Sequence, residues 1–191
     1  MFFMVDRVLY IKNMVCDRCV MVVRERLLAL GLEVETVELG RALLGRPATD
    51  EERAAIRSTL EAVGFELLDD PRSRLVERTR ALIIDWTRRE ERDPSRNLSD
   101  FLSDRLHQDY SALSKLFSEE TGTTIERYAI AQRIELAKEL LSYGERSLGE
   151  IADRLGYSSV AHLSNQFKRV VGQTPSAYRR LARGRKPLDR V

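Results

Sequence analysis

Two stretches in the C-terminal half of the chain repeat one pattern. Each combines a short amphipathic helix, a short break, and a second helix whose outward side chains are small, polar or basic. They run over residues 98–122 (LSDFLSDRLHQDYSALSKLFSEETG) and 148–172 (LGEIADRLGYSSVAHLSNQFKRVVG). A second helix of this kind fits the major groove of duplex DNA and can present side chains to base edges. The repeat predicts two helix-turn-helix units, which together can span two groove segments without a dimer.

Charge is divided unevenly between the two parts of the chain. Residues 1–70 hold 9 Lys and Arg against 13 Asp and Glu, a net charge of −4, whereas residues 71–191 hold 23 against 17, a net charge of +6. A surface that neutralises DNA phosphates must be basic. We therefore expect the part with the repeated pattern to bind DNA, and we expect residues 1–70 not to bind it alone.

The first 70 residues alternate between strand and helix patterns. Strands are predicted where β-branched and aromatic residues cluster, and a Thr49–Glu52 capping box opens the second helix. The predicted elements are a strand at 7–13, a helix at 16–30, strands at 34–39 and 41–45, a helix from 49 to about 64, and a strand at 65–68. This β-α-β-β-α-β order is that of ferredoxin-like folds.

After the strand pattern ends at Asp69-Asp70-Pro71, every later segment is helical. Helices outside the repeated pattern are predicted from Arg74 to about Glu90, over 127–142, and from Pro175 through Tyr178. The predicted fold class is therefore α+β. It comprises a ferredoxin-like βαββαβ domain at 1–70, an all-α double helix-turn-helix domain at 71–183, and a tail at 184–191.

Three segments of the C-terminal part form a recognisable set: IAQRIELAKELL (130–141), SLGEIADRLGYSS (147–159) and HLSNQFKRVVGQTPSAYRR (162–180). Together they resemble the AraC/XylS family of transcription regulators, over about residues 74–182. The resemblance implies seven helices, with two recognition helices in adjacent major grooves about 34 Å apart. One departure is the first turn, where His107-Gln108-Asp109 replaces the usual Gly. His, Asn and Asp tolerate the left-handed backbone that such a turn requires.

The same resemblance implies which side chains face the DNA bases. They are Ser111, Ser114 and Lys115 in the first unit, and Val160, Ala161, His162 and Asn165 in the second. Their chemistry is compatible with this role, because Lys115 can donate to guanine and Asn165 can pair with adenine. His162 and Gln166 can do either.

Phosphate contacts are expected from the basic residues that follow, which position a protein on DNA without specifying sequence. They are Lys168, Arg169, Arg179 and Arg180. For any single polar residue, a solvated surface position is the competing interpretation. The apolar residues at helical spacing are expected to form the core, and Tyr157 is expected to pack with them.

Both cysteines of the chain lie in one motif, Cys16-x-x-Cys19, between the first predicted strand and helix. Together with Met14, the order of elements and the Gly64-Phe65 pair, the motif resembles the metal loop of heavy-metal-associated domains. That resemblance covers roughly residues 6–70. Two thiolates at a helix N-terminus can bind a soft monovalent ion in a linear geometry, and Cu(I) fits best. Zn(II) prefers about four ligands, and no His lies nearby to complete them.

Three alternatives to a metal site stay open at this point. The thiols can form a reversible redox disulfide, they can be ordinary surface thiols, or the domain can have kept the fold only as a dimerisation or partner surface. The loop also departs from the family, since Asn13 stands where Gly is usual and Asp17-Arg18 replaces small residues between the cysteines. Met14 is expected to anchor the loop in the core.

These patterns predict a cytoplasmic, sequence-specific DNA-binding transcription regulator, controlled by a soft metal ion or by the thiol state of Cys16 and Cys19. Its expected partners are double-stranded DNA and RNA polymerase, and both a monomer and a homodimer stay open. We expect no signal peptide, and no apolar run reaches the ~18 residues of a membrane span. With two histidines, no recognisable nucleophile–base pair and no glycine-rich phosphate loop, we do not expect an enzyme. The alternative is a metallochaperone or thiol redox protein whose helical domain docks on a protein partner.

Overall fold

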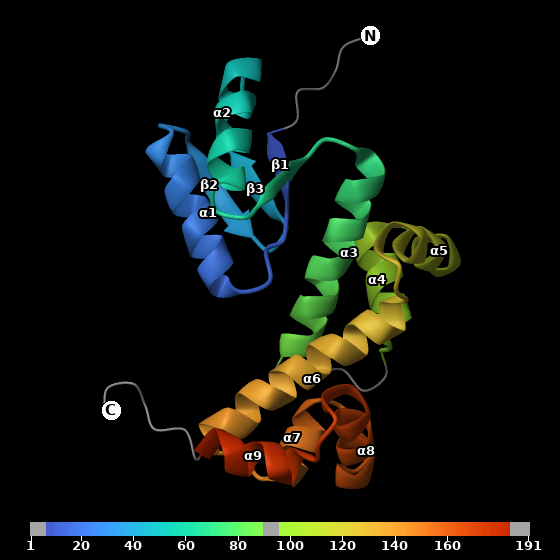
Figure 1. The fold of residues 1–191 in the computed structure, drawn as a ribbon. Helices are drawn as coiled ribbons and strands as arrows, with labels where there is room; N and C mark the ends of the chain where they lie inside the picture. Colours follow the sequence, from blue (N-terminus) through green and yellow to red (C-terminus); the bar gives the residue numbers. More distant parts are fainter. Residues whose placement is uncertain (1–6, 90–95, 184–191) are drawn as a thin grey trace. The chain divides into compact units, whose positions relative to one another are not determined.

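The N-terminal part of the chain is a four-stranded sheet with two helices (Figure 1). The structure is a computed structural model that describes residues 7–89 and 96–183. The elements of this part are β1 (Val8–Lys12), α1 (Asp17–Ala29), β2 (Val34–Glu38), β3 (Arg41–Leu44), α2 (Asp50–Glu61) and β4 (Glu66–Leu68). The strand order is β2-β3-β1-β4, and each neighbouring pair is antiparallel. A mixed α/β part with a small antiparallel sheet is therefore confirmed.

Alternation along β1 separates the two faces of this sheet. Leu9 and Ile11 are buried in one hydrophobic core with Leu27 of α1 and Leu60 of α2. Each such side chain contributes about 1.5–3 kcal/mol when it is fully buried. Tyr10 lies between Leu9 and Ile11 in the sequence, so it points to the opposite face of the sheet. The two helices thus cover one face, and the other is left to the segment that follows β4.

That segment is α3 (Pro71–Arg88), which begins one turn before the predicted start at Arg74. Asp70 Oδ2 accepts hydrogen bonds from the Ser73 backbone N–H at 2.8 Å and from the Ser73 hydroxyl at 2.9 Å. These bonds lower the pKa of the Asp70 carboxyl. A side-chain acceptor before a helix and a proline at its first position both favour a helix N-terminus. Asp69-Asp70-Pro71 therefore starts a helix as well as ending a strand. The predicted end near Glu90 lies outside the described residues.

Helices α3–α9 are the seven that the structure describes after β4, the number that the AraC/XylS resemblance implies. Besides α3 they are α4 (Leu98–Leu106), α5 (Tyr110–Thr121), α6 (Ile125–Tyr143), α7 (Leu148–Arg154), α8 (Val160–Val171) and α9 (Pro175–Arg183). Five of them begin after a side chain that accepts a backbone N–H three residues further on. These capping residues are Asn97, Asp109, Thr124, Ser147 and Ser159.

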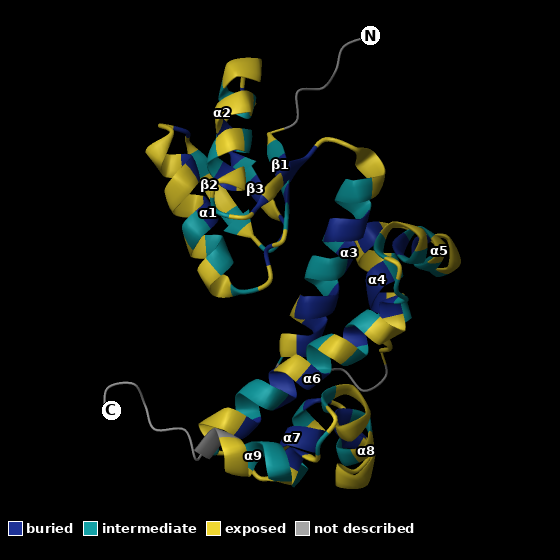
Figure 2. Ribbon diagram, in the orientation of Figure 1, coloured by how far each residue is buried: buried dark blue, intermediate teal, exposed yellow. Residues whose placement is uncertain are grey.

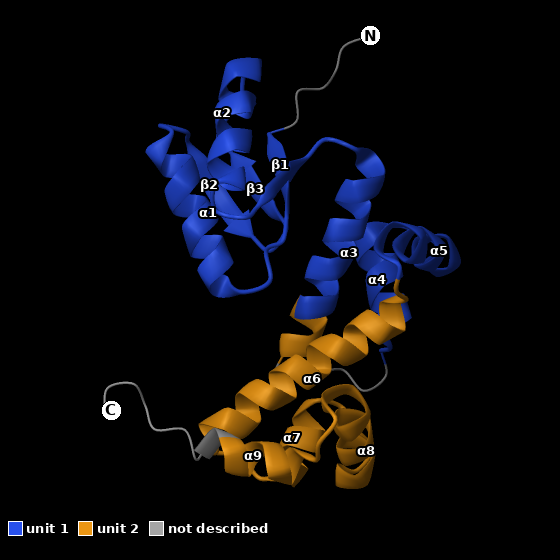
Figure 3. Cartoon of the chain, viewed as in Figure 1, with its two compact units in different colours: residues 1–84, 96–122 blue, residues 85–95, 123–191 orange. Residues whose placement is uncertain are grey.

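The chain divides into two compact units (Figure 3). Residues 1–84 and 96–122 form the first unit, and residues 85–95 and 123–191 form the second. The first unit contains the sheet, most of α3, and the helix pair α4–α5. The second contains α6 to α9. The domain boundary predicted at 70/71 stays a prediction, and the predicted tail at 184–191 lies outside the described residues.

Burial follows the amphipathic patterns of the helices (Figure 2). In the second unit, Ile134 and Leu141 of α6, Ile151 of α7, and Leu163 and Phe167 of α8 belong to one hydrophobic core. None of the helices among the described residues is both long enough and apolar enough to cross a membrane.

Candidate nucleic-acid interface

The first helix-turn-helix unit, here called the first reader, consists of α4 and α5. His107 ends α4 with φ 53° and ψ 44°, in the left-handed region. Glycine adopts this conformation most readily, and His107 adopts it here, so His107 gives the turn its left-handed backbone. Asp109 then caps α5, and hydrogen bonds from the Ser111 hydroxyl and the Ala112 backbone N–H lower the pKa of its carboxyl.

Within α5, opposite faces have opposite roles. Leu113 and Phe117 are 2% and 0% exposed and hold the helix against its unit. On the outward side, Ser111 and Lys115 are exposed and Ser114 is partly buried. The Ser111 hydroxyl donates to Asp109 Oδ1 at 2.6 Å, so it supports the cap of the helix. Lys115 is therefore the side chain of this predicted set best suited to reach a base.

The second reader consists of α7 and α8. Ser147 and Glu150 form a capping box at the start of α7, and the Ser159 hydroxyl accepts the His162 backbone N–H at 3.1 Å at the start of α8. Phe167 is fully buried and meets the Tyr178 ring edge to face, with centroids 5.6 Å apart. Packing against α6, α7 and α9 fixes which face of α8 points outward.

That outward face carries the residues predicted to contact bases. Val160, Ala161, His162 and Asn165 are exposed, and Gln166 is partly buried. Most of α8 is accordingly coloured as exposed in Figure 2. The structure thus brings all five predicted residues of the second reader to one helix.

The four residues predicted to contact phosphate are not equivalent. Lys168, Arg169 and Arg180 are exposed. Arg179 is partly buried, and its Nη2 donates to the Arg146 backbone carbonyl at 2.8 Å. Because that bond ties α9 to the loop before α7, Arg179 has a structural contact that the other three do not show.

Sequence reasoning expected only packing from Tyr157, but the structure also gives it polar and aromatic contacts. Its hydroxyl donates to Gln166 Oε1 at 2.6 Å. Its ring meets the His162 ring at a centroid distance of 5.2 Å and an angle of 87°. No periodic pattern joins a turn residue to α8, so nothing in the sequence signalled these contacts.

The cysteine motif lies at the start of α1. Cys16 is the N-cap residue, Cys19 lies in the first turn, and both are partly buried and not bonded to each other. Their Sγ atoms are 3.5 Å apart. Met14 is 1% exposed in the core, which confirms the expected anchor. Among the residues that the structure describes, no group of three or more His, Cys, Asp or Glu side chains could hold a metal ion.

Two cysteine sulfurs are suitable ligands for a two-coordinate soft metal ion, but the distance between them would have to change slightly for an ion to bind. With metal–sulfur bonds of ~2.3 Å, a linear arrangement spans about 4.6 Å. A disulfide requires ~2.05 Å. The observed separation lies between these values, so either outcome moves the sulfurs by roughly an ångström or more. The donor set favours neither over the other.

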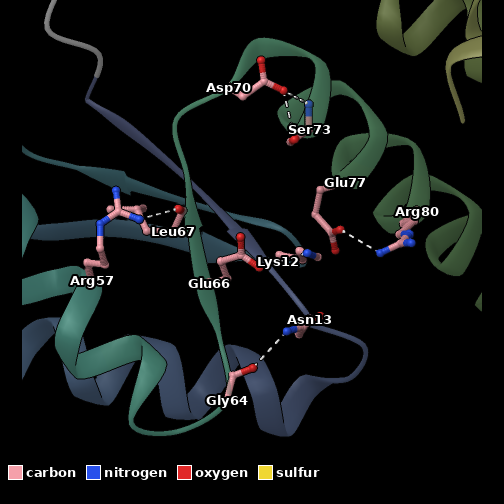
Figure 4. Close-up of polar contacts among 10 residues, drawn as sticks. All are labelled: Lys12, Asn13, Arg57, Gly64, Glu66, Leu67, Asp70, Ser73, Glu77 and Arg80. Atoms are coloured by element: carbon pink, nitrogen blue, oxygen red, sulfur yellow. Dashed lines mark hydrogen bonds and ion pairs between the residues drawn. The ribbon is translucent and has the colours of Figure 1, made fainter. Parts of the chain in front are cut away.

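Asn13 lies in the loop before the cysteines and contacts both Gly64 and, in α3, Glu77; Figure 4 draws all three residues. Asn13 has φ 75°, and its Nδ2 donates to the Gly64 carbonyl at 3.0 Å. Its backbone N–H donates to the Glu77 carboxylate of α3, which is 4% exposed. Burial raises the pKa of Glu77, whereas Arg80, the Asn13 N–H and Lys12 act to lower it. Arg80 Nη1 lies 3.4 Å from Glu77 Oε2.

Further contacts join α3 to the sheet and to the first reader. Arg74 Nε donates to the Leu68 carbonyl at 3.1 Å, and its guanidinium lies 5.2 Å from the centre of the Tyr10 ring. At the other side of the first unit, Arg72 contacts Glu119 at 3.0 Å and Glu120 at 3.2 Å, near the C-terminal end of α5. Helix α3 therefore touches both the cysteine loop and the first recognition helix. The sequence did not predict these contacts of α3, because they join residues that are far apart in the chain.

Comparisons with known proteins agree with the geometry of the two readers. A family model described as a helix-turn-helix domain matches residues 102–181. The transcriptional activator RhrA of Rhizobium meliloti (strain 1021) is 41% identical over 73 residues, which are 37% of this chain and 23% of that protein. The probable transcriptional regulator LumQ of Photobacterium leiognathi is 33% identical over 63 residues, 33% of this chain and 25% of that protein. The chain spans about a quarter or less of the length of the curated relatives it matches.

Among solved structures, the C-terminal domain of AraT, a response regulator from Geobacillus stearothermophilus, aligns with a TM-score of 0.50. It is 28% identical, and the alignment covers 59% of this chain and 88% of that one. Residues 102–181 therefore carry a helix-turn-helix domain.

Proposed function

We propose that the protein is a sequence-specific DNA-binding transcription regulator that reads two adjacent major-groove segments with α5 and α8. The observation that carries this proposal is the matched helix-turn-helix domain, in which both recognition helices expose polar side chains over a buried apolar face. Lys115, His162 and Asn165 would be the main base readers, with Ser111, Ser114, Val160, Ala161 and Gln166 beside them. Lys168, Arg169 and Arg180 would contact phosphates. Arg179 would attract the DNA phosphates through its charge, without contacting them directly.

The direct test is selection of bound sites from random duplex DNA, using the reduced full chain. We expect an enriched motif with two elements about one helical turn, ~34 Å, apart. Binding should weaken steeply with salt, because each neutralised phosphate releases counterions. Recovery of random sequence alone would refute the proposal.

We further propose that residues 1–70 form a ferredoxin-like module, similar to heavy-metal-associated domains, that controls DNA binding through Cys16 and Cys19. Its element order and strand order support the module. Cys16 and Cys19 would hold a soft ion such as Cu(I), or would lose two electrons and two protons to a two-electron oxidant and form a disulfide. Either change alters the loop that contains Asn13. Because Asn13 contacts Glu77, the change would reach α3 and, through Arg72, the first reader.

A three-way comparison tests this control. Cu(I) or the oxidant diamide should change the affinity of the wild type for its selected site. Cys16→Ser should abolish both copper binding and the response. The Glu77→Gln variant should still bind copper, but copper should change its DNA affinity less, because the contact between Asn13 and α3 has lost the carboxylate charge. An affinity indifferent to copper and to diamide would leave the DNA-binding proposal intact and refute the control.

The proposed cellular setting follows from the proposed function. A regulator that reads duplex DNA would act in the cytoplasm, with RNA polymerase as its protein partner, either as a monomer or as a homodimer. Bacterial two-hybrid contact with polymerase subunits, with and without the selected site, would test that partner.

A further inference from the structure

Tyr157 lies in the turn between α7 and α8 and contacts two side chains of the second recognition helix. It is 5% exposed. Its hydroxyl donates to Gln166 Oε1 at 2.6 Å, and its ring lies nearly perpendicular to the His162 ring, with centroids 5.2 Å apart. One buried side chain therefore fixes two residues that stand on the reading face of α8.

The contact with Gln166 limits what that residue can offer to DNA. A free glutamine amide has both an acceptor and a donor, and it pairs with adenine by using both, at N6 and N7. Here the oxygen accepts a hydrogen bond from the hydroxyl of a buried ring, which uses one of its two lone pairs and holds the oxygen toward Tyr157. With the amide held in this orientation, the group turned away from Tyr157 and toward a base edge is the NH2, which only donates.

His162 is restrained in the same way. Its backbone N–H donates to Ser159 Oγ at 3.1 Å, and its Nδ1 lies 3.3 Å from Ser158 Oγ. The Tyr157 ring packs nearly perpendicular to the imidazole. Nε2 is then the ring nitrogen that remains for a base or a phosphate. The turn thus arranges the reading face before any DNA arrives.

We propose that Tyr157 is a positioning residue that makes Gln166 a donor-only reader, so that the base opposite Gln166 is one with major-groove acceptors, guanine before adenine. Guanine presents two acceptors there, O6 and N7, whereas adenine pairs one acceptor with a donor. This inference rests on the proposed DNA-binding function and adds the chemistry of one recognised base.

The test uses the full chain and two conservative variants. Tyr157→Phe keeps the buried ring and removes only the hydroxyl. Tyr143→Phe is the matched control, because Tyr143 belongs to α6 and to neither reader, is 66% exposed, and has its hydroxyl 3.4 Å from Glu139 of the same helix. Each is put through selection from random duplex DNA, beside the wild type and Gln166→Ala. Circular dichroism confirms that each variant remains folded.

We expect the wild type to prefer guanine at one position of the second element, and Gln166→Ala to lose that preference. In Tyr157→Phe the Gln166 amide is free to rotate and should pair with adenine as well. The ratio of guanine to adenine among the selected sites should therefore fall about two- to tenfold at this position, which corresponds to the free energy of one neutral hydrogen bond. Other positions should be unchanged, and Tyr143→Phe should match the wild type.

Two results would overturn the inference alone. One is a Tyr157→Phe motif identical to that of the wild type, or weakened at all positions alike, as a purely structural role would give. The other is a Gln166→Ala change at a position that Tyr157→Phe leaves untouched. A wild type that enriches no motif would overturn the proposed function and this inference together.

Discussion

The backbone of Asn13 gives the sharpest test of the cysteine loop. Its φ of 75° lies in the left-handed region, and its side chain donates to the Gly64 carbonyl at 3.0 Å. Asn13→Ala removes a hydrogen bond of an exposed side chain, about 0.5 kcal/mol at the low end of the range. It also places a Cβ with no polar compensation in that region, which costs about 1 kcal/mol. We therefore expect Asn13→Ala to reduce the stability of the sheet by about 1.5 kcal/mol.

Asn13→Gly separates the two contributions. Glycine loses the same hydrogen bond but has no Cβ penalty, and the greater freedom of its unfolded chain offsets part of that relief. The Ala variant should therefore be less stable than the Gly variant by less than about 1 kcal/mol.

Hydrogen exchange of the β1 amides is the appropriate assay, because it reports the opening of the unit that contains the loop. Asn165→Ala, on α8 of the other unit, serves as the control and should leave these amides unchanged. Equal stabilities of the Ala and Gly variants would show that residue 13 is not held in the left-handed conformation, and would contradict a strained backbone beside the cysteines.

Five other substitutions test separate parts of the account. His162→Ala and Asn165→Ala should relax base preference by about 1–3 kcal/mol per lost contact, measured by binding to single-base variants of the selected site. Arg180→Ala should instead lower the affinity for all DNA sequences alike. It should also reduce the slope of log affinity against log salt concentration by about one. Because burial raises the pKa of Glu77, the contribution of Glu77 to stability should be fully present below the ordinary carboxyl pKa and be lost as pH rises through the higher folded value. Glu77→Gln should remove that loss, which denaturant unfolding at acid and neutral pH would detect. Thr49→Ala removes the cap of α2 and should cost about 1 kcal/mol in the same unfolding measurement.

Local patterns predicted the elements well, because their causes are local. The Thr49–Glu52 capping box appears as expected at the start of α2. The alternation that buries Leu9 and Ile11 is visible in the sequence itself. At the start of α3, the Asp70-Pro71 pair both ends the strand pattern and begins a helix, because Asp70 accepts the Ser73 backbone N–H and proline suits the first position of a helix. The predicted start at Arg74 is therefore three residues late.

The contacts that matter most for the proposed mechanism lie between segments distant in sequence. Asn13 and Glu77 meet only because the sheet brings β1 beside β4 and the chain then enters α3. The bond from Tyr157 to Gln166 crosses a turn, where neither helical nor strand periodicity relates the two positions. The family resemblance implies that His162 and Asn165 face outward, and both are exposed on α8. A resemblance cannot supply the side-chain bonds that restrain their neighbours.

The central claim is that two recognition helices of one chain read two separate DNA elements. Site selection with each reader disabled in turn tests it most directly, using Lys115→Glu for α5 and Asn165→Glu for α8. Our account predicts two elements about one helical turn apart for the wild type, with a different element lost in each variant. A single element for the wild type, or loss of the same element in both variants, would contradict it.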